Sequence, residues 1–260
     1  MYRAQRQAKL RIMSLPAQPA ISYGQQLLPD LFVVSWLGMI PGQIDCHVFV
    51  LRSSQGLLLI DAGTPWGHGR LLENLAHWQL APAEIRTVLL THGHVDHVSG
   101  AYHFAAQGAE ILSHRELQSM IECQWEATGV QPSGGGAYRV AGYLEPGTTL
   151  TRCGFEITVL ASPGHTRHCL SFLITVNGGR CLFSGDLLMG NAQPGWHGDP
   201  GYDPVALQDS LRRLLQEDFQ HLCYGHGVVL NDRGALFRRA LASASTWPER
   251  PPITGRHPAR

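Results

Sequence analysis

The sequence lacks three features that would assign it to particular classes of protein. No uninterrupted apolar run among its 260 residues approaches the roughly 18 that a membrane-spanning helix needs. The formal net charge is zero with histidine neutral, so the sequence gives no excess of basic residues that would predict nucleic-acid binding. The six cysteines are scattered and form no C-x-x-C pair, which is typical of reduced, mostly buried thiols. We therefore expect a cytoplasmic protein with neither nucleic-acid nor membrane partners, and a homodimer is left open.

Composition separates the chain into three parts. Residues 1–30 carry four basic side chains, no acid before Asp30 and no continuous apolar core. We expect this part to be a poorly ordered extension rather than a secretory signal, with an organellar presequence as the weaker alternative. The strand and helix patterns fall within residues 31–243, which predicts one domain there. Residues 244–260 form a Pro-rich tail.

Short apolar or β-branched runs bounded by Gly, Pro or Ser predict strands, and apolar residues at helical spacing predict helices. The expected strands are Leu31–Trp36, Cys46–Leu51, Gly56–Ile60, Thr87–Leu90, Ile111–Leu112, Phe155–Leu160, Leu170–Val176, Arg180–Phe183 and His221–Tyr224. Helices are expected near Arg70–Leu80, from about Val98, after Ser113, after the N-cap pair Asp203-Pro204 and around Ala235–Ala242. The Gly-rich residues 124–147 predict a mobile loop beside the pocket or, alternatively, a plain linker.

Three histidines and one aspartate fall within six consecutive positions, directly after an apolar run that predicts a buried strand. The stretch is Thr91-His92-Gly93-His94-Val95-Asp96-His97. His92 and His94 are two residues apart, so in an extended backbone both imidazoles point to the same side and could bind one cation. Asp96 and His97 come where the chain should turn into a helix, so they could serve a second cation. Imidazole suits zinc, iron, nickel and copper, and the carboxylate keeps zinc, iron and manganese open. A His-rich surface loop is the alternative.

This stretch resembles the metal-binding motif of the metallo-β-lactamase superfamily, and four further elements occur in the family's order. They are Ile60-Asp61-Ala62-Gly63, Ser162-Pro163-Gly164-His165-Thr166, Leu182-Phe183-Ser184-Gly185-Asp186 and Tyr224-Gly225-His226-Gly227. The resemblance covers about residues 31–243. It implies an α/β (α+β) fold, a four-layer αββα sandwich of two mixed β-sheets flanked by helices.

The resemblance also implies a binuclear metal centre. His92, His94 and His165 would hold the first divalent cation, and Asp96, His97 and His226 the second. Asp186 would bridge both, and Asp61 would support the metal loop without binding metal. The expected cofactors are two zinc ions, with iron or manganese as alternatives. Asp96 and Asp186 would take part in catalysis together with a metal-activated water.

The implied activity is hydrolysis of a small ester, thioester or lactone, as in the hydroxyacylglutathione hydrolases and lactonases that the chain resembles. Only about 34 residues follow His226, so we expect no helical domain of the kind that supplies glutathione contacts in the first of these groups. The second hypothesis is an oxidoreductase that resembles persulfide dioxygenases, with one iron held by His92, His165 and Asp186. The third is a catalytically weak, ligand-binding relative.

Several other side chains lie close to these motifs in the sequence without matching them. We interpret the further histidines as structural or surface residues, namely His103, His114, His168, His197 and His221. Tyr202, Tyr224 or His168 could assist the leaving group, although the motifs place none of them. Trp66 and Trp196 follow strand-end aspartates and could line an apolar pocket wall or simply pack in the core.

Overall fold

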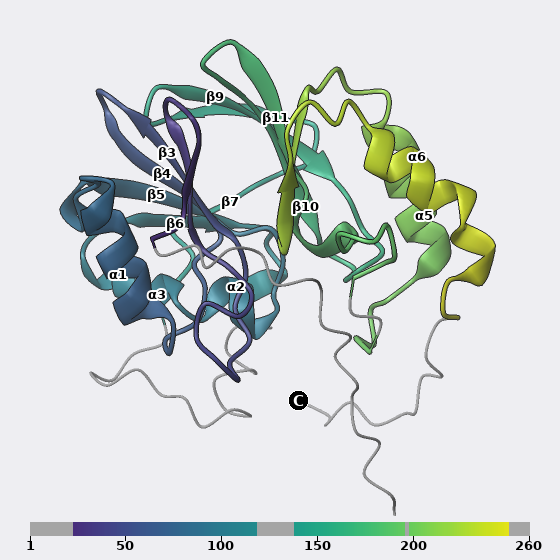
Figure 1. Ribbon diagram of the computed structural model, residues 1–260, viewed down its shortest axis with the longest axis horizontal. Helices are drawn as coiled ribbons and strands as arrows, with labels where there is room; N and C mark the ends of the chain where they lie inside the picture. Colours follow the sequence, from purple (N-terminus) through teal and green to yellow (C-terminus); the bar gives the residue numbers. More distant parts are fainter. Residues whose placement is uncertain (1–22, 119–137, 196–197, 250–260) are drawn as a thin grey trace, which may run out of the picture.

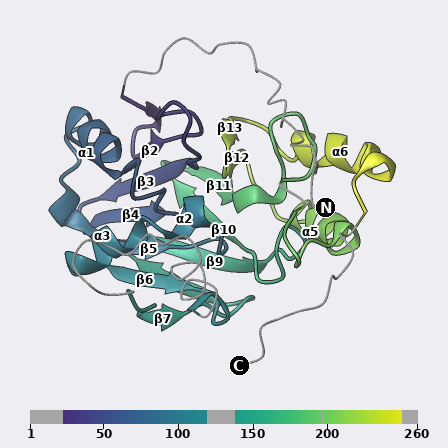
Figure 2. The same cartoon turned by 90° about the horizontal axis from the view of Figure 1, so that it is seen from below.

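The computed structural model describes residues 23–118, 138–195 and 198–249. Two sheets face each other, and helices cover their outer faces (Figure 1). Helices α1 (His68–His77) and α3 (Ala101–Ala106) lie on the outside of one sheet, and α5 (Pro204–Leu214) and α6 (Ala235–Ala242) on the outside of the other. Figure 2 shows the same arrangement from below. The predicted αββα sandwich is confirmed.

Each half of the chain supplies one mixed sheet. Among the described residues the first sheet has seven strands in sequence order: β1 Gln25–Leu28, β2 Leu31–Ser35, β3 Val48–Ser53, β4 Gly56–Ile60, β5 Ile85–Leu89, β6 Glu110–Ser113 and β7 Gly142–Tyr143. The second, in spatial order, has six: β13 Gly227–Val229, β12 His221–Tyr224, β11 Gly179–Phe183, β10 Leu170–Val176, β9 Phe155–Ala161 and β8 Thr149–Arg152. Strands β4 to β7 pair in parallel, as do β11 and β12, and the other pairs are antiparallel.

The four layers follow from side chains that alternate between two apolar environments. In β3, Val48 and Val50 pack under the helices of the first half, whereas Phe49 and Leu51 pack between the sheets. Successive side chains of a strand point to opposite faces, so a strand that is apolar at every position must be covered on both faces. In β10, Leu173 likewise faces α5 and α6 while its neighbours face the other sheet. Three apolar clusters therefore separate four layers.

Several elements differ from their predicted limits. Residues 25–28 form β1, so the ordered domain begins inside the segment expected to be an extension. At the other end Trp247 is buried against the C-terminal cluster, so the packed domain continues past residue 243. The prediction of a mobile loop over 124–147 is wrong for residues 138–147. Strand β7 forms there, and the Tyr138 hydroxyl donates to the Val98 carbonyl. Residues 124–137 lie outside the described part of the chain.

The helix expected from about Val98 begins earlier and is divided in two. Helix α2 (Val95–Val98) starts inside the histidine motif, and α3 follows after Gly100. A side chain at position 100 would collide with the Ala62 carbonyl oxygen, so glycine lets α2 and α3 approach the end of β4. Helix α2 lies at the lower end of the sheets in Figure 1. Across the described residues, no helix combines the length and apolar character that crossing a bilayer requires.

Candidate metal centre

The predicted metal ligands and the supporting Asp61 all follow the carboxyl ends of strands. Asp61 follows β4, the histidine motif follows β5, and His165 follows β9. Asp186 lies in the short 3-10 helix η2 (Gly185–Leu187) after β11, and His226 follows β12. The backbone N–H of Leu170 donates to the Thr91 carbonyl, and that of His47 donates to the Gly225 carbonyl. These bonds tie the loops of one sheet to those of the other.

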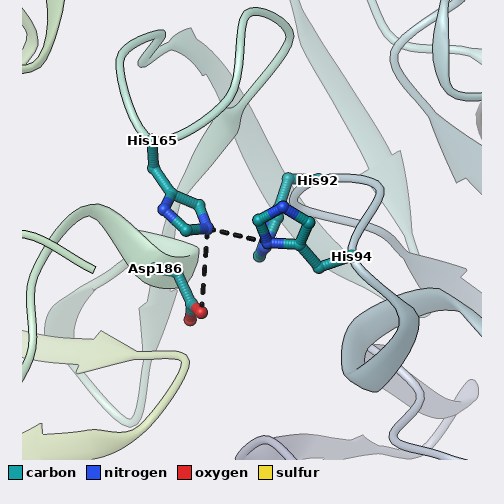
Figure 3. Close-up of side chains that lie close together, drawn as sticks. All are labelled: His92, His94, His165 and Asp186. Carbon is teal, nitrogen blue, oxygen red and sulfur yellow. Dashed lines mark hydrogen bonds and ion pairs between the residues drawn. The ribbon is translucent and has the colours of Figure 1, made fainter. Parts of the chain in front are cut away.

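The structure brings together four predicted residues as a first ligand group: His92, His94, His165 and Asp186 (Figure 3). The Nδ1 atom of His94 lies 3.1 Å from His92 Nε2 and 2.9 Å from His165 Nε2. The Asp186 Oδ2 atom lies 3.8 Å from His165 Nε2. Ligand atoms about 2.0–2.1 Å from a tetrahedral zinc ion are about 3.3 Å apart, so this spacing suits a divalent cation.

The second ligand group comprises Asp96, His97, His226 and, again, Asp186. The Nε2 atom of His97 is 3.3 Å from Asp186 Oδ1 and 3.7 Å from Asp96 Oδ2. The Nε2 atom of His226 is 3.0 Å from Asp186 Oδ2 and 3.6 Å from Asp96 Oδ2. Asp186 therefore belongs to both groups, as a bridging carboxylate would.

Hydrogen bonds behind His92 define which of its nitrogens carries hydrogen. The Thr91 hydroxyl lies 2.9 and 3.0 Å from the two Asp61 carboxylate oxygens, to which it must donate because a carboxylate only accepts. The same hydroxyl oxygen, 3.0 Å from His92 Nδ1, is then left to accept from that nitrogen. The Nε2 atom of His92 keeps its lone pair and turns it toward the first ligand group.

Asp61 acts on His97 in the same way. Its Oδ2 atom lies 2.8 Å from His97 Nδ1, so Nδ1 donates and Nε2 is left to face two carboxylates, where it can bind a cation once it is deprotonated. Both His97 Nε2 and Asp186 Oδ1 are buried, and neither has a hydrogen-bond partner among the described residues. Buried polar atoms are rarely left unpaired, and a cation between them would satisfy both. The donor set therefore fits a metal ion.

The electrostatic environment lowers the pKa of His92 and of His165 in the first group and raises the pKa of His97 and of His226 in the second. Burial lowers the pKa of His165 to about 3 and that of His92 well below its usual value. Burial also lowers the pKa of His97, but the surrounding carboxylates outweigh it and hold that pKa well above its usual value. For Asp186, burial raises the pKa, and the opposing effect of His226 and His97 leaves it well below its usual value. An ionised Asp186 beside neutral imidazoles is the state that binds metal.

Sequence reasoning missed two carboxylates next to the centre. The Asp199 Oδ2 atom lies 3.0 Å from His94 Nε2, on the opposite side of the ring from the first ligand group. Asp45 is buried, where its carboxylate oxygens accept from the backbone N–H of Cys46 and the hydroxyl of Thr64. Both lie in irregular segments rather than directly after a strand, so no local pattern marks them.

The remaining histidines and aromatic residues lie outside both ligand groups. His103 stacks on His68 with ring centroids 3.6 Å apart, and His114 stacks on His168 at 4.8 Å. The Nδ1 atom of His221 accepts from the Asn231 backbone. The predicted leaving-group residues Tyr202 and Tyr224 are buried in the cluster beneath α5 and α6. Trp66 is 45% exposed, which excludes a core position, and Trp196 and His197 lie outside the described residues.

A third group of potential ligands, Cys46, Asp61 and His97, adjoins the second. Burial raises the pKa of the Cys46 thiol, which keeps it protonated and a poor metal ligand. Asp61 already accepts hydrogen bonds from Thr91 and His97. We therefore assign this group to the support of the centre rather than to metal binding.

Comparison with known proteins places this geometry in a family. A rat protein named metallo-beta-lactamase domain-containing protein 1 is 31% identical over 71% of this chain, and the match spans 64% of its own length. The hydroxyacylglutathione hydrolase of Aeromonas salmonicida is 26% identical over 75% of this chain and 67% of its own. This chain thus spans less than two thirds of the first of these relatives.

Solved structures give the same fold. A metallo-beta-lactamase from Cronobacter sakazakii, altered in its HARLDQ motif, matches with a TM-score of 0.66 over 88% of this chain and 96% of its own. At 17% identity this likeness shows the fold alone. The family model described as the metallo-beta-lactamase superfamily matches residues 41–226, which include both ligand groups and most of the chain. The chain therefore belongs to the metallo-beta-lactamase superfamily.

Proposed function

We propose that the protein is a hydrolase that uses two divalent cations to cleave a small thioester, ester or lactone. The observation that carries this proposal is that Asp186 is shared by two adjoining groups of ligand atoms. A single carboxylate between two such groups is the arrangement that lets two cations act on one water and one carbonyl. Most members of the superfamily are hydrolases, which supports the same reaction class.

In this proposal His92, His94 and His165 hold one cation, Asp96, His97 and His226 hold the other, and Asp186 binds both. When bound, the cations would lower the pKa of a water toward neutrality and polarise a substrate carbonyl. Imidazole and carboxylate ligands without thiolate suit zinc, and the same set accepts iron or manganese.

The protein's own residues would orient the reacting groups. The side chain of Asp96 is 13% exposed, against 6% for Asp186, so Asp96 offers the more accessible carboxylate of the two. We assign to Asp96 the acceptance of a hydrogen bond from the attacking water, in addition to its place in the second ligand group. Its Oδ2 atom is 3.6 Å from His226 Nε2, which holds the carboxylate at this position.

The choice of leaving group follows from where the described part of the chain places the two tyrosines that could protonate it. Tyr202 and Tyr224 are buried in the apolar cluster beneath α5 and α6, and burial raises the pKa of Tyr202 to about 12. A thiolate or a ring-opened alkoxide needs less protonation than an amide nitrogen, so the arrangement favours thioesters, esters and lactones. One relative is named as a hydrolase of hydroxyacylglutathione, which supports an acylated small molecule as the substrate. The zero net charge supports a small-molecule substrate over a nucleic acid.

The test begins with elemental analysis of the purified, unsupplemented protein. We expect about two metal atoms per chain, with zinc predominant, as the two ligand groups require. Hydrolysis is then measured on a panel of acyl thioesters, aryl esters and lactones, for the protein and for Asp186→Ala. The control variant is Asp209→Ala, because that exposed carboxylate pairs with Arg212 on the surface of α5. One iron atom per chain together with oxygen consumption on thiol substrates would refute hydrolysis and favour the oxidoreductase hypothesis.

A further inference from the structure

Both ring nitrogens of His94 have close polar neighbours. Its Nδ1 atom meets the nitrogens of His92 and His165 at 3.1 and 2.9 Å (Figure 3). Its Nε2 atom lies 3.0 Å from the Asp199 carboxylate. The Asp199 side chain is only 14% exposed, so water competes little for this bond.

The Asp199 contact determines which nitrogen of His94 carries the hydrogen. A carboxylate only accepts, so Nε2 must donate to Asp199 Oδ2 and Nδ1 must hold the lone pair. The lone pair then points into the first ligand group, where His92 and His165 converge. With the other tautomer, an N–H would point at those nitrogens and no cation could bind through Nδ1.

We propose that Asp199 is a positioning residue that holds the tautomer and the ring orientation of His94 and thereby sets the affinity of the first ligand group for metal. The role rests on the proposed metal binding, and it adds a residue that neither the motifs nor the family match assigns. Asp199 binds no metal in this assignment, because its contact is to the nitrogen of His94 that faces away from the group.

Asp199 is itself held by backbone hydrogen bonds. Its Oδ1 atom accepts from the Gly201 N–H at 2.5 Å, and its carbonyl oxygen accepts from the Tyr202 N–H at 2.9 Å. The backbone N–H of Asp203 donates to the Gly164 carbonyl, next to His165. The segment 199–203 is therefore anchored on the loop that carries another member of the ligand group. The two carboxylate oxygens of Asp199 accept from two different donors, His94 and Gly201. An amide has only one oxygen, so replacing Asp199 by asparagine must lose one of these bonds.

Asp199→Asn is the diagnostic variant, because it keeps the shape of the side chain and removes one acceptor. If the amide oxygen faces Gly201, the amide NH2 faces His94 Nε2 and favours the wrong tautomer. If the oxygen faces His94, the NH2 opposes the Gly201 N–H. Asp203→Asn is the matched control: one oxygen of Asp203 accepts from both Val205 and Ala206, a task that an amide oxygen can take over.

The experiment has two readouts. Zinc affinity is measured by chelator competition, fitted for two sites, in the wild type and both variants. The His94 tautomer is measured in the metal-free protein from its imidazole 15N shifts. We expect Asp199→Asn to bind one of the two zinc ions about 10- to 100-fold more weakly, the usual effect of losing a hydrogen-bond partner of a ligand. Asp203→Asn should stay within about twofold of the wild type, since it loses no such partner.

The outcomes separate this role from the proposed function. If Asp199→Asn leaves the His94 Nε2–H tautomer and both zinc affinities unchanged, the positioning role is refuted. If the wild type binds no zinc, yet Asp199→Asn shifts the tautomer and Asp203→Asn does not, Asp199 still orients His94, whereas its effect on metal affinity and the proposed metal-dependent function are both refuted. Equal weakening by both variants would indicate a general loosening of the segment 199–203 and would also refute the role.

Discussion

Asp61→Asn should weaken the second ligand group without unfolding the protein. The Asp61 carboxylate accepts from the Thr91 N–H at 2.8 Å, from the Thr91 hydroxyl, and from His97 Nδ1 at 2.8 Å. It is 2% exposed, so no solvent can replace a lost bond. The residue has a φ of 60°, a left-handed conformation that asparagine adopts as readily as aspartate. The substitution therefore replaces one hydrogen-bond acceptor by a donor and keeps the shape of the side chain and the backbone conformation.

The size of the effect follows from the two orientations open to the amide. If its oxygen faces Thr91, its NH2 donates to His97 Nδ1, and the proton of His97 moves to Nε2, where metal should bind. If its oxygen faces His97, its NH2 opposes the buried Thr91 N–H, and an unpaired buried donor costs about 1–3 kcal/mol. At about 1.4 kcal/mol per factor of ten, the second zinc ion should bind about 5- to 150-fold more weakly.

Chelator competition fitted for two sites measures this difference, and thermal unfolding of the metal-free protein checks that the fold survives. Asp209→Asn serves as the control, because its carboxylate lies on the surface and pairs with Arg212. Asp199→Asn complements it, since that variant should weaken the other zinc ion. If Asp61→Asn keeps both zinc affinities within about twofold of the wild type, the tautomer argument is wrong.

Three further variants, one of them with a control, test the centre and its surroundings. Asp186→Ala should lower the metal content below two atoms per chain and abolish hydrolysis, which elemental analysis and the substrate panel check. Gly225→Ala should also lower the metal content and abolish hydrolysis, because a Cβ there would collide with Asp186 and crowd His97. Its control is Gly69→Ala, which lies in open space on α1 and should raise the melting temperature. Burial raises the pKa of Asp45 to about 6, so the folded state keeps a proton that the unfolded state releases near pH 4. The free energy of unfolding should therefore fall as the pH rises from about 4 to about 6 and stay lower above that. In urea titrations of the metal-free protein, Asp45→Asn should raise the free energy of unfolding at about pH 7 by up to ~3 kcal/mol and change it little near pH 4.

The residues of both ligand groups could be predicted because each follows a strand that the apolar pattern already marks. The strand before His92 is buried at three consecutive positions, and that before Asp186 likewise, so their ends are fixed by the core. Strands such as β1 and β8 were missed because they lie at sheet edges and expose polar residues, so their sequences lack a continuous apolar run. The short β13 was missed because three residues give no period to measure.

Asp199 shows a different limit of sequence reasoning. It lies 13 residues after Asp186, in an irregular segment rich in glycine and proline, and its partner His94 is 105 residues away. Only the packing of segment 199–203 on the His165 loop brings the two side chains together. An aspartate in such a segment has the same local pattern whether it caps a turn or orients a metal ligand. Its role could be inferred only once the direction of the His94 ring was known.

The contrast between residues at strand ends and residues in irregular segments explains why the reaction class is easier to infer than the substrate. The candidate metal ligands come from both halves of the chain, and the strands that precede them are held by the three apolar clusters. Changing one of these residues disturbs both the centre and the packing around it. The segments 36–47, 188–195 and 198–203, which carry Asp45 and Asp199 beside the centre, contribute no strand to either sheet. Exposed apolar side chains such as Leu37 and Ile44 lie on one of these segments. A fold can therefore keep one metal centre while its loops change the substrate, and loop chemistry must be tested directly.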